Sequence, residues 1–483
     1  MGGAERDDPA PPVAGADAPT SAGPHVPASP APVTGSGEVV DQPSEPAETT
    51  EAERTAARNA RRPAPRMAPD IAHHAALDAR MVAAASPIKV LSLASWPAGQ
   101  ELQFLADHAR GVATPPRIDY PRHDFGEARR ELDAIAREAD PSHPLGEYLI
   151  DSSHSWGVAA QLCEALGSHD VTALSLQLYG SPDDALPGNG PTACDAARHF
   201  IAIADTFDRE LMAPAEHVPL SAADLQAQLQ GDLDQFFGSR MIEVVLDPDL
   251  IAKAAAGATR IRLRTCAQFS DYDREQLLQH EALVHSLTAL NGREQPLMQS
   301  LSLSSPRTTA TQEGLATFAE QITGSIDIGR MKRLSLRIQA VAMAIEGADF
   351  IEVFGYFLDA GQSPEESFAS SHRVFRGVPT TGGAAFTKDT VYLRGLIGVH
   401  TFFRWALRER ELRLCRWLFA GKMTLHDVQR FEPLFEAGVL LPPRWIPHWA
   451  ARASGLAGML AFSLFANQIR LDRVDDVDGF RDI

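Results

Sequence analysis

The sequence predicts a helix-rich α+β fold. Apolar residues recur at helical spacing in several long stretches, short β-branched runs stand between them, and no internal repeat interrupts the pattern after about residue 67. At 483 residues and 44% apolar content, the chain can bury a large core. We therefore expect one domain over 67–440 and a C-terminal helical extension over 441–483 that packs on it.

The first 66 residues differ in composition from the rest of the chain. They are rich in Pro, Ala, Gly, Ser, Thr and acidic residues and contain no Phe, Trp or Tyr. Such a stretch buries too little apolar surface to offset the entropy lost on ordering. We expect 1–66 to be a disordered tail.

Individual elements follow from local patterns. The β-branched runs at 88–93 and 241–246 favour strands, and apolar spacing favours helices over 127–138 and 222–237. Apolar and basic residues alternate over 259–265, which is typical of a half-exposed strand. If it is an edge strand, an extended substrate could pair with it.

Composition also excludes some functions. The net charge of -19 argues against broad contact with nucleic acid or an anionic membrane. The four cysteines are scattered without a CxxC pair, which argues against a thiolate metal site or a disulfide scaffold. Because we find neither a signal peptide nor a membrane-spanning run, we expect a cytoplasmic protein.

A helix is predicted to begin at Ser270, which forms a capping-box pattern with Asp273, and to end at Asn291-Gly292. It contains His280-Glu281-Ala282-Leu283-Val284-His285, in which the histidines are five residues apart. On an ideal α-helix such a pair is about 140° apart around the axis. A π-type turn would bring both rings to one side, as metal ligands require. The alternative is two unrelated histidines on a half-buried helix.

A third ligand is predicted in Thr311-Gln312-Glu313-Gly314-Leu315-Ala316, where Thr311 is suited to capping a helix and Glu313 falls in its first turn. Zinc peptidases of the gluzincin type take a glutamate from such a second helix. Two histidines and one glutamate leave a coordination position to water, which Glu281 could activate as general base. The alternative is that Glu313 only interacts favourably with the helix dipole.

Over about residues 70 to 440 the sequence resembles the flavohaemoglobin expression-modulating QEGLA-motif proteins, which are related to the microtubule-associated tyrosine carboxypeptidases. The resemblance is carried by the histidine helix, by Gln312-Glu313-Gly314-Leu315-Ala316, and by motifs that run in the same order along the chain: Leu178-Tyr179-Gly180-Ser181-Pro182, Arg373-Val374-Phe375-Arg376-Gly377, Phe386-Thr387-Lys388-Asp389 and Tyr392-Leu393-Arg394-Gly395.

This resemblance implies a gluzincin-like metallopeptidase core whose metal-binding helix follows a strand. It also implies Zn²⁺ as cofactor, with His280, His285 and Glu313 as ligands and Glu281 as catalytic base.

A carboxypeptidase must also hold the terminal carboxylate of a peptide or protein. For this role we nominate basic and hydroxyl side chains in the later motifs: Arg376, Lys388, Tyr392 and Arg394. Alternatively, these residues brace their loop by pairing with Asp389 or another carboxylate. Tubulin is disfavoured as a substrate because its acidic tails would meet a chain of net charge -19.

The first functional hypothesis is a zinc carboxypeptidase. The second is a regulatory or binding protein, in which the metal site is structural or vestigial. A third keeps the metal and changes the bond, as in an amidase or aminopeptidase.

Overall fold

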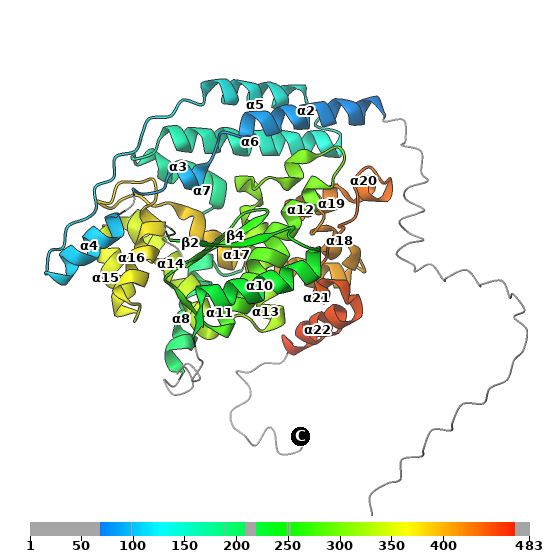
Figure 1. Cartoon of the computed structure of the whole chain (residues 1–483). Helices are drawn as coiled ribbons and strands as arrows, with labels where there is room; N and C mark the ends of the chain where they lie inside the picture. The colour runs from blue at the N-terminus through cyan, green and yellow to red at the C-terminus, as the bar shows by residue number, and fades with distance from the viewer. Residues whose placement is uncertain are drawn as a thin grey trace, which may run out of the picture. The chain divides into compact units, whose positions relative to one another are not determined.

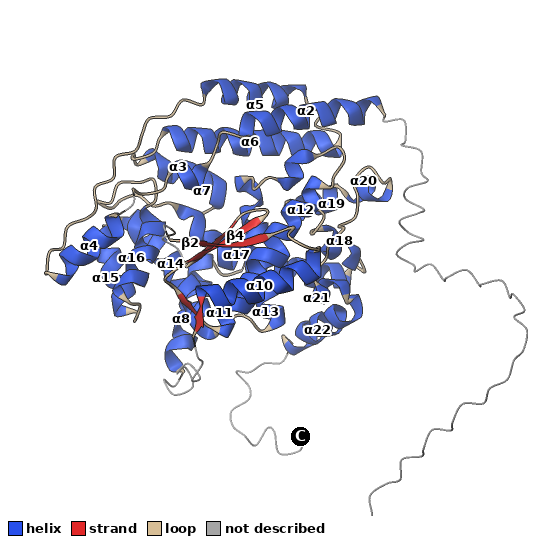
Figure 2. Cartoon of the chain, in the orientation of Figure 1, coloured by secondary structure: helices blue, strands red, loops and turns tan. Residues whose placement is uncertain are grey.

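The computed structural model describes residues 68–468 except 98, 189, 208–218, 249 and 251–252 (Figure 1). The tail expected over 1–66 and the end of the expected extension, 469–483, lie outside the described residues. The described residues belong to one compact unit that begins at Arg66. Helices dominate it and the strands are short (Figure 2), so the helix-rich α+β class is confirmed.

The N-terminal part of the described chain is helical. Helices α2, α5 and α6 pack side by side (Figure 1) and bury Leu77, Leu132 and Leu149 between them. The helix predicted over 127–138 is confirmed as α5. The elements in this part are α2 (Pro69–Ala85), α3 (Val90–Leu93), α4 (Gln100–Ala109), α5 (Gly126–Glu138), α6 (Pro144–Glu164), α7 (Asp170–Tyr179) and α8 (Ala193–Thr206).

The strand predicted over 88–93 is wrong, because this run contains the short helix α3. The backbone N–H groups of Leu93 and Ala94 donate to the carbonyls four residues earlier, at 2.9 and 3.0 Å. Helix α3 packs on α6 with Val90 buried, while Leu91 is 41% exposed. Within the described residues the sheets are built from other segments, so this backbone satisfies its polar groups locally and packing overrides β-propensity.

Helix α10 (Ala222–Phe237) confirms the helix predicted over 222–237. Two small sheets lie beside it. In one sheet β1 (Leu220–Ser221) pairs antiparallel with β5 (Gln268–Phe269). In the other, β4 pairs parallel with β2 and antiparallel with β3. The strands of this second sheet are β2 (Glu243–Asp247), β3 (Ala254–Ala256) and β4 (Arg260–Arg264), so both remaining predicted strands are confirmed.

The alternating strand is not an edge strand, because β4 lies between β2 and β3. Its alternation comes from the burial of one face alone: Ile261 and Leu263 are fully buried, whereas Arg260 and Arg262 are exposed. With both edges of its backbone hydrogen-bonded, β4 has no free edge for a substrate.

The remaining helices include those that carry the site described below. They are α11 (Asp271–Gln276), the π-helix η1 (Leu277–Ser286), α12 (Leu287–Arg293), the 3₁₀ turns η2 (Gln299–Ser302) and η3 (Pro306–Thr308), α13 (Thr309–Thr323), α14 (Ile328–Glu346), α15 (Phe350–Asp359), α16 (Pro364–Phe375), the 3₁₀ turn η4 (Thr387–Thr390), α17 (Val391–Arg408), α18 (Leu412–Trp417), α19 (Leu425–Arg430), α20 (Glu432–Glu436), α21 (His448–Ala451) and α22 (Ala453–Ala466).

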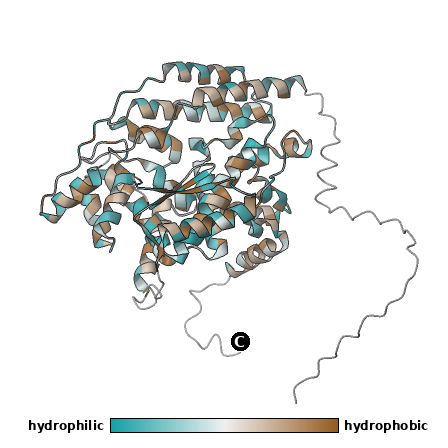
Figure 3. Ribbon diagram, in the orientation of Figure 1, coloured by the Kyte–Doolittle hydropathy of each residue, from teal (hydrophilic) through white to brown (hydrophobic). Residues whose placement is uncertain are grey.

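Helix α22 packs on α17 and is apolar along most of its length (Figure 3). Leu456 and Leu460 are buried, whereas Phe462 and Phe465 remain 73% and 64% exposed. In the part of the chain that the structure describes, no helix combines the length and the apolarity that crossing a membrane requires.

Candidate metal centre

The histidine helix begins as predicted. The Ser270 side chain accepts from the backbone N–H of Asp273 at 3.1 Å, and the Asp273 carboxylate accepts from the backbone N–H of Ser270 at 2.9 Å. This confirmed capping box starts α11 directly after β5, so the helix follows a strand. It fixes where the helical register begins, ahead of the histidines.

The distortion predicted between the histidines is confirmed. The ten residues Leu277–Ser286 form a π-helix, in which backbone hydrogen bonds run to the fifth residue along the chain. His280 and His285 therefore lie on one side of the helix, with ring centroids 4.8 Å apart and ring planes at 82°. The five-residue spacing, which would separate the two rings on an ideal α-helix, places them on the same side of this π-helix.

The predicted end of this helix is wrong, because α12 continues through Asn291 and Gly292 to Arg293. The Asn291 side chain donates to the carbonyls of Phe419 and Trp445 at 2.8 and 2.7 Å. A Cβ atom on Gly292 would lie 2.2 Å from the Leu301 carbonyl oxygen. Both residues thus serve tertiary packing, and neither supplies a left-handed turn.

The second ligand helix begins earlier than predicted. Helix α13 starts at Thr309 after the turn η3, so Thr311 is inside the helix and Glu313 is in its second turn. The interaction of a carboxylate with the helix dipole falls off within the first turn, which weakens that explanation for Glu313. Gly314 lets α13 touch α17: a Cβ atom there would lie 2.2 Å from the carbonyl carbon of Gly395.

Three side chains from these two helices converge. The Oε2 atom of Glu313 lies 3.4 Å from Nε2 of His280 and 3.6 Å from Nε2 of His285. One nitrogen or oxygen atom from each residue lies within 4.8 Å of the others, an arrangement that could hold a metal ion. The side chain of Glu313 is 13% exposed and that of His280 only 5%. Glu281, half-buried next to His280, is close enough for its charge to act on Arg330.

A second layer of charged groups orients His280. Its Nδ1 atom lies 2.5 Å from Oε1 of Glu320, two turns after Glu313 on α13. Arg330 of α14 donates to both oxygens of Glu320, with one contact at 2.7 Å. Burial disfavours a charged imidazole, but the hydrogen bonds to Glu313 and Glu320 outweigh it and raise the pKa of His280 to about 10. Glu320 and Arg330 were not predicted from the sequence; the seven-residue spacing from Glu313 places Glu320 on the same face of a helix and could have indicated it.

Lys388 contacts Glu313, one of the three candidate ligands, directly. Its Nζ atom lies 2.7 Å from Oε1 of Glu313, the oxygen that faces away from the histidines. Burial would raise the pKa of Glu313, but the Lys388 charge and the histidine hydrogen bonds hold it well below its usual value. Glu313 is thus a carboxylate at neutral pH, and Lys388 fixes its orientation.

Beyond Lys388 lies a cluster of three arginines around one carboxylate. Arg373 donates from Nε and Nη2 to Asp389, each at 2.7 Å, and Arg337 lies 3.9 Å from the same group. Arg373 also donates to the Tyr392 hydroxyl at 3.1 Å. Burial, followed by the charge of Arg373, lowers the pKa values of Arg337 and Arg376 to about 10. The three arginines of this cluster carry more positive charge than the single carboxylate of Asp389 neutralises.

The four residues nominated for substrate contact thus divide. Lys388 lies beneath the Tyr392 ring at 5.3 Å, and Arg376 belongs to the arginine cluster. Arg394 instead pairs with Asp184 at 3.0 Å, in a half-exposed contact beside Gly180. Arg337 was not predicted as a member of the cluster, because it comes from α14, which contains none of the family motifs.

The convergence of two helical histidines, an adjacent glutamate and a glutamate from a second helix is the pattern of a metallopeptidase site. Consistent with this, the chain belongs to the microtubule-associated tyrosine carboxypeptidase family, whose sequence profile matches residues 103–468. A comparison with curated proteins returns no match. The predicted relation to the tyrosine carboxypeptidases is confirmed, and the chain falls in a peptidase family; the narrower QEGLA assignment stays a prediction.

Proposed function

We propose that the chain is a zinc-dependent carboxypeptidase that hydrolyses the last peptide bond of a peptide or protein. The observation that carries this proposal is the convergence of His280, His285 and Glu313 on one point, with Glu281 beside them. The family match supports the carboxypeptidase class. Zinc and the roles of individual residues rest on the site's geometry and chemistry.

The donor set fits a zinc ion. Zinc in a tetrahedral site lies about 2.0–2.2 Å from nitrogen and oxygen ligands, which sets ligand-to-ligand distances of about 3.4 Å. The distances from Glu313 to His280 and His285 are 3.4 and 3.6 Å, and all three donor atoms lie within 4.8 Å of one another. The carboxylate of Glu320 on the other ring nitrogen of His280 is the partner that zinc-bound histidines commonly have.

Bound zinc would polarise the scissile carbonyl and lower the pKa of the attacking water. Glu281 takes the proton from that water as its oxygen adds to the carbonyl carbon. It then delivers the proton to the leaving amine as the C–N bond breaks. Lys388 keeps Glu313 ionised and in place through both steps.

The arginine cluster supports carboxypeptidase over aminopeptidase activity, because it is suited to a substrate carboxylate. Arg373 and Arg337 pair with one carboxylate, Asp389, whose charge also acts on Arg376. The Nε–H groups of Arg337 and Arg376 are buried and have no acceptor among the described residues. Side-chain exposures of 21% for Arg337 and 28% for Arg373 show that part of the cluster reaches solvent. A terminal carboxylate would supply the missing acceptors and charge.

The substrate we propose is not tubulin. The family name refers to microtubules, but this chain carries a net charge of -19, and acidic tubulin tails would be repelled by it at long range. We expect a peptide or protein C-terminus of lower negative charge.

A Glu281→Gln variant tests the function. We expect it to retain stoichiometric zinc by metal analysis and to lose release of the C-terminal residue by about 10²- to 10⁴-fold. Glu294→Gln is the matched control, since Glu294 is a surface residue that pairs with Arg444. Zinc-loaded wild type that releases nothing from a broad library of free-acid peptides would refute the peptidase function.

A further inference from the structure

A second lysine, Lys422, lies close to the candidate metal centre. It belongs to the loop between α18 and α19 and is only 7% exposed. Its backbone N–H donates to the Leu301 carbonyl at 2.7 Å, and its Nζ atom donates to the Ser304 hydroxyl at 2.8 Å. Within the described residues Ser304 is the ammonium's one hydrogen-bond partner, so two of its three N–H groups lack a protein acceptor.

Two carboxylates of the candidate metal centre act electrostatically on this ammonium. They are the carboxylates of Glu313 and Glu281, the proposed zinc ligand and the proposed base. Neither carboxylate forms an ion pair with Lys422 within 4.0 Å in the described structure, so the lysine is near them without being neutralised by contact. Burial lowers the pKa of Lys422 to about 8, against the opposing effect of the two carboxylates.

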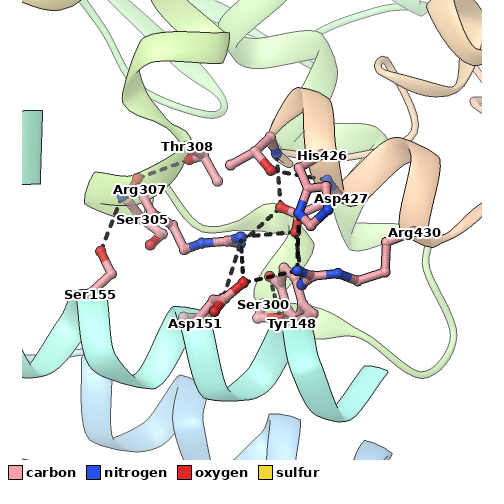
Figure 4. A network of polar contacts seen from close by, with 12 residues as sticks. Tyr148, Asp151, Ser155, Ser300, Ser305, Arg307, Thr308, His426, Asp427 and Arg430 are labelled. Carbon is pink, nitrogen blue, oxygen red and sulfur yellow. Dashed lines mark hydrogen bonds and ion pairs between the residues drawn. The ribbon is translucent and has the colours of Figure 1, made fainter. Parts of the chain in front are cut away.

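A network of polar contacts around Arg307 and Asp427 joins the two segments that carry the lysine and its serine partner (Figure 4). Asp427, five residues after Lys422, accepts from Arg307 at 2.8 and 2.9 Å, and Arg307 is three residues after Ser304. Arg430 adds a contact from Asp427 to Asp151 of α6. The network therefore clamps the segment that carries Lys422 to the segment that carries Ser304 and leads into α13.

A rigidly held ammonium with unused donors is costly in a buried position unless a ligand completes its hydrogen bonding. The two carboxylates that act on it, Glu313 and Glu281, belong to the site that would surround the reacting carbonyl. A carbonyl oxygen develops negative charge when water adds, and a preorganised cation stabilises that charge more in a site shielded from water than in bulk solvent.

We propose that Lys422 is a catalytic residue that donates a hydrogen bond to the scissile carbonyl oxygen and to the oxyanion it becomes. This inference rests on the proposed function. As the water oxygen bonds to the carbonyl carbon, the π electron pair moves to the carbonyl oxygen, and Lys422 keeps its proton while Glu281 takes that of the water. When the oxyanion reforms the carbonyl, the C–N bond breaks and the amine leaves with the proton from Glu281.

Lys422→Met tests the proposal, because methionine keeps an unbranched side chain and removes the charge. We expect kcat for a free-acid peptide to fall by about 10²- to 10³-fold with KM changed less than about threefold. Lys422→Arg should recover part of kcat. Lys89→Met, at the exposed position just before α3, is the matched control and should behave as wild type.

A role in holding the terminal carboxylate predicts the opposite pattern: KM rises and kcat is kept, which would overturn the proposal. Unchanged kcat in Lys422→Met with normal zinc content would also overturn it. Thermal unfolding and metal analysis of each variant identify a loss of folding or of zinc. If Lys422→Met shows such a loss, the folded, zinc-loaded Lys422→Arg variant is compared with wild type instead: a kcat below that of wild type with KM nearly unchanged supports the proposal, and an unchanged kcat overturns it.

Binding of a peptidyl phosphonate, whose tetrahedral anion mimics the hydrated carbonyl, gives a second measurement that needs no turnover. By calorimetry on zinc-loaded protein, Lys422→Met should bind it about 100-fold more weakly, while affinity for the product peptide stays within about threefold. If wild type binds the phosphonate more tightly than Lys422→Met does but hydrolyses nothing, the proposed function fails while the Lys422 contact stands. Equal phosphonate affinities in wild type and variant would refute the contact alone.

Discussion

His280 and Glu320 form a buried pair in which the carboxylate accepts from Nδ1 of the imidazole at 2.5 Å. Because that bond occupies Nδ1, the other ring nitrogen is left facing His285 and Glu313. Arg330 keeps Glu320 ionised, so the orientation of the first histidine depends on a residue of α14, outside every motif of the site.

This relationship predicts that Glu320→Gln weakens zinc binding about 10- to 100-fold, because an amide orients the ring and raises its basicity less than a carboxylate does. Titration against a competing chelator measures the affinity. Glu346→Gln, at the far end of α14, is the control. Equal zinc affinities in wild type and Glu320→Gln would contradict the proposed role.

The contact between Gly314 and Gly395 predicts that Gly314→Ala destabilises the protein. The new methyl group would lie 2.2 Å from the Gly395 backbone, so α13 and α17 must separate, and overpacking of this kind costs about 1–3 kcal/mol or more. Denaturant unfolding measures the change. Gly355→Ala is the matched control, since that helical glycine has nothing within 4 Å of the new Cβ atom and should unfold at the same or slightly higher denaturant concentration.

The arginine cluster predicts a substrate-dependent effect of Arg376→Ala. We expect KM for free-acid peptides to rise about 10- to 100-fold, because a charge-assisted contact to the carboxylate is lost. Hydrolysis of C-terminally amidated peptides should change much less. A smaller effect is expected for Arg394→Ala, whose guanidinium already pairs with Asp184. If Arg376→Ala impairs free-acid and amidated peptides equally, the carboxylate contact is wrong.

Asp78 predicts a pH dependence of stability. This buried carboxyl accepts from the Ser300 backbone N–H at 3.1 Å, and burial raises its pKa to about 6 from the ordinary 3.8. Between those values the folded protein binds more protons than the unfolded chain, so stability falls as pH rises through about 4 to 6. The full loss above pH 6 is about 3 kcal/mol.

Denaturant unfolding at pH 4 to 7 measures this dependence. Asp78→Asn should flatten it, because the variant has no carboxyl to ionise. The exposed Asp119→Asn should keep the wild-type slope. A slope that is the same in wild type and Asp78→Asn would exclude Asp78 as its source.

Local sequence was sufficient for several features. The five-residue spacing of His280 and His285 required a π-helix, because helical geometry alone decides which side chains share a face. The capping box at Ser270 and Asp273 was also predictable, since it uses backbone groups only three residues apart. The alternation in 259–265 identified a strand and its buried face, although not its position within a sheet.

Other features were decided by tertiary structure. The 88–93 run became a helix because it packs on α6, and because no strand of the described residues pairs with it, so packing outweighed β-propensity. Asn291 and Gly292 stayed helical because the chain near 301, 419 and 445 packs against them. A single sequence contains no record of which distant segment supplies those contacts.

The sequence by itself thus determined which residues could act as ligands and base, since residue type and helical spacing are local properties. Only the tertiary structure decided what surrounds them: Glu320 behind His280, Lys388 against Glu313, and Lys422 near Glu281. Charges interact through space, so the partners that tune a buried group are set by how α13, α14 and the loops around them pack, not by distance along the chain.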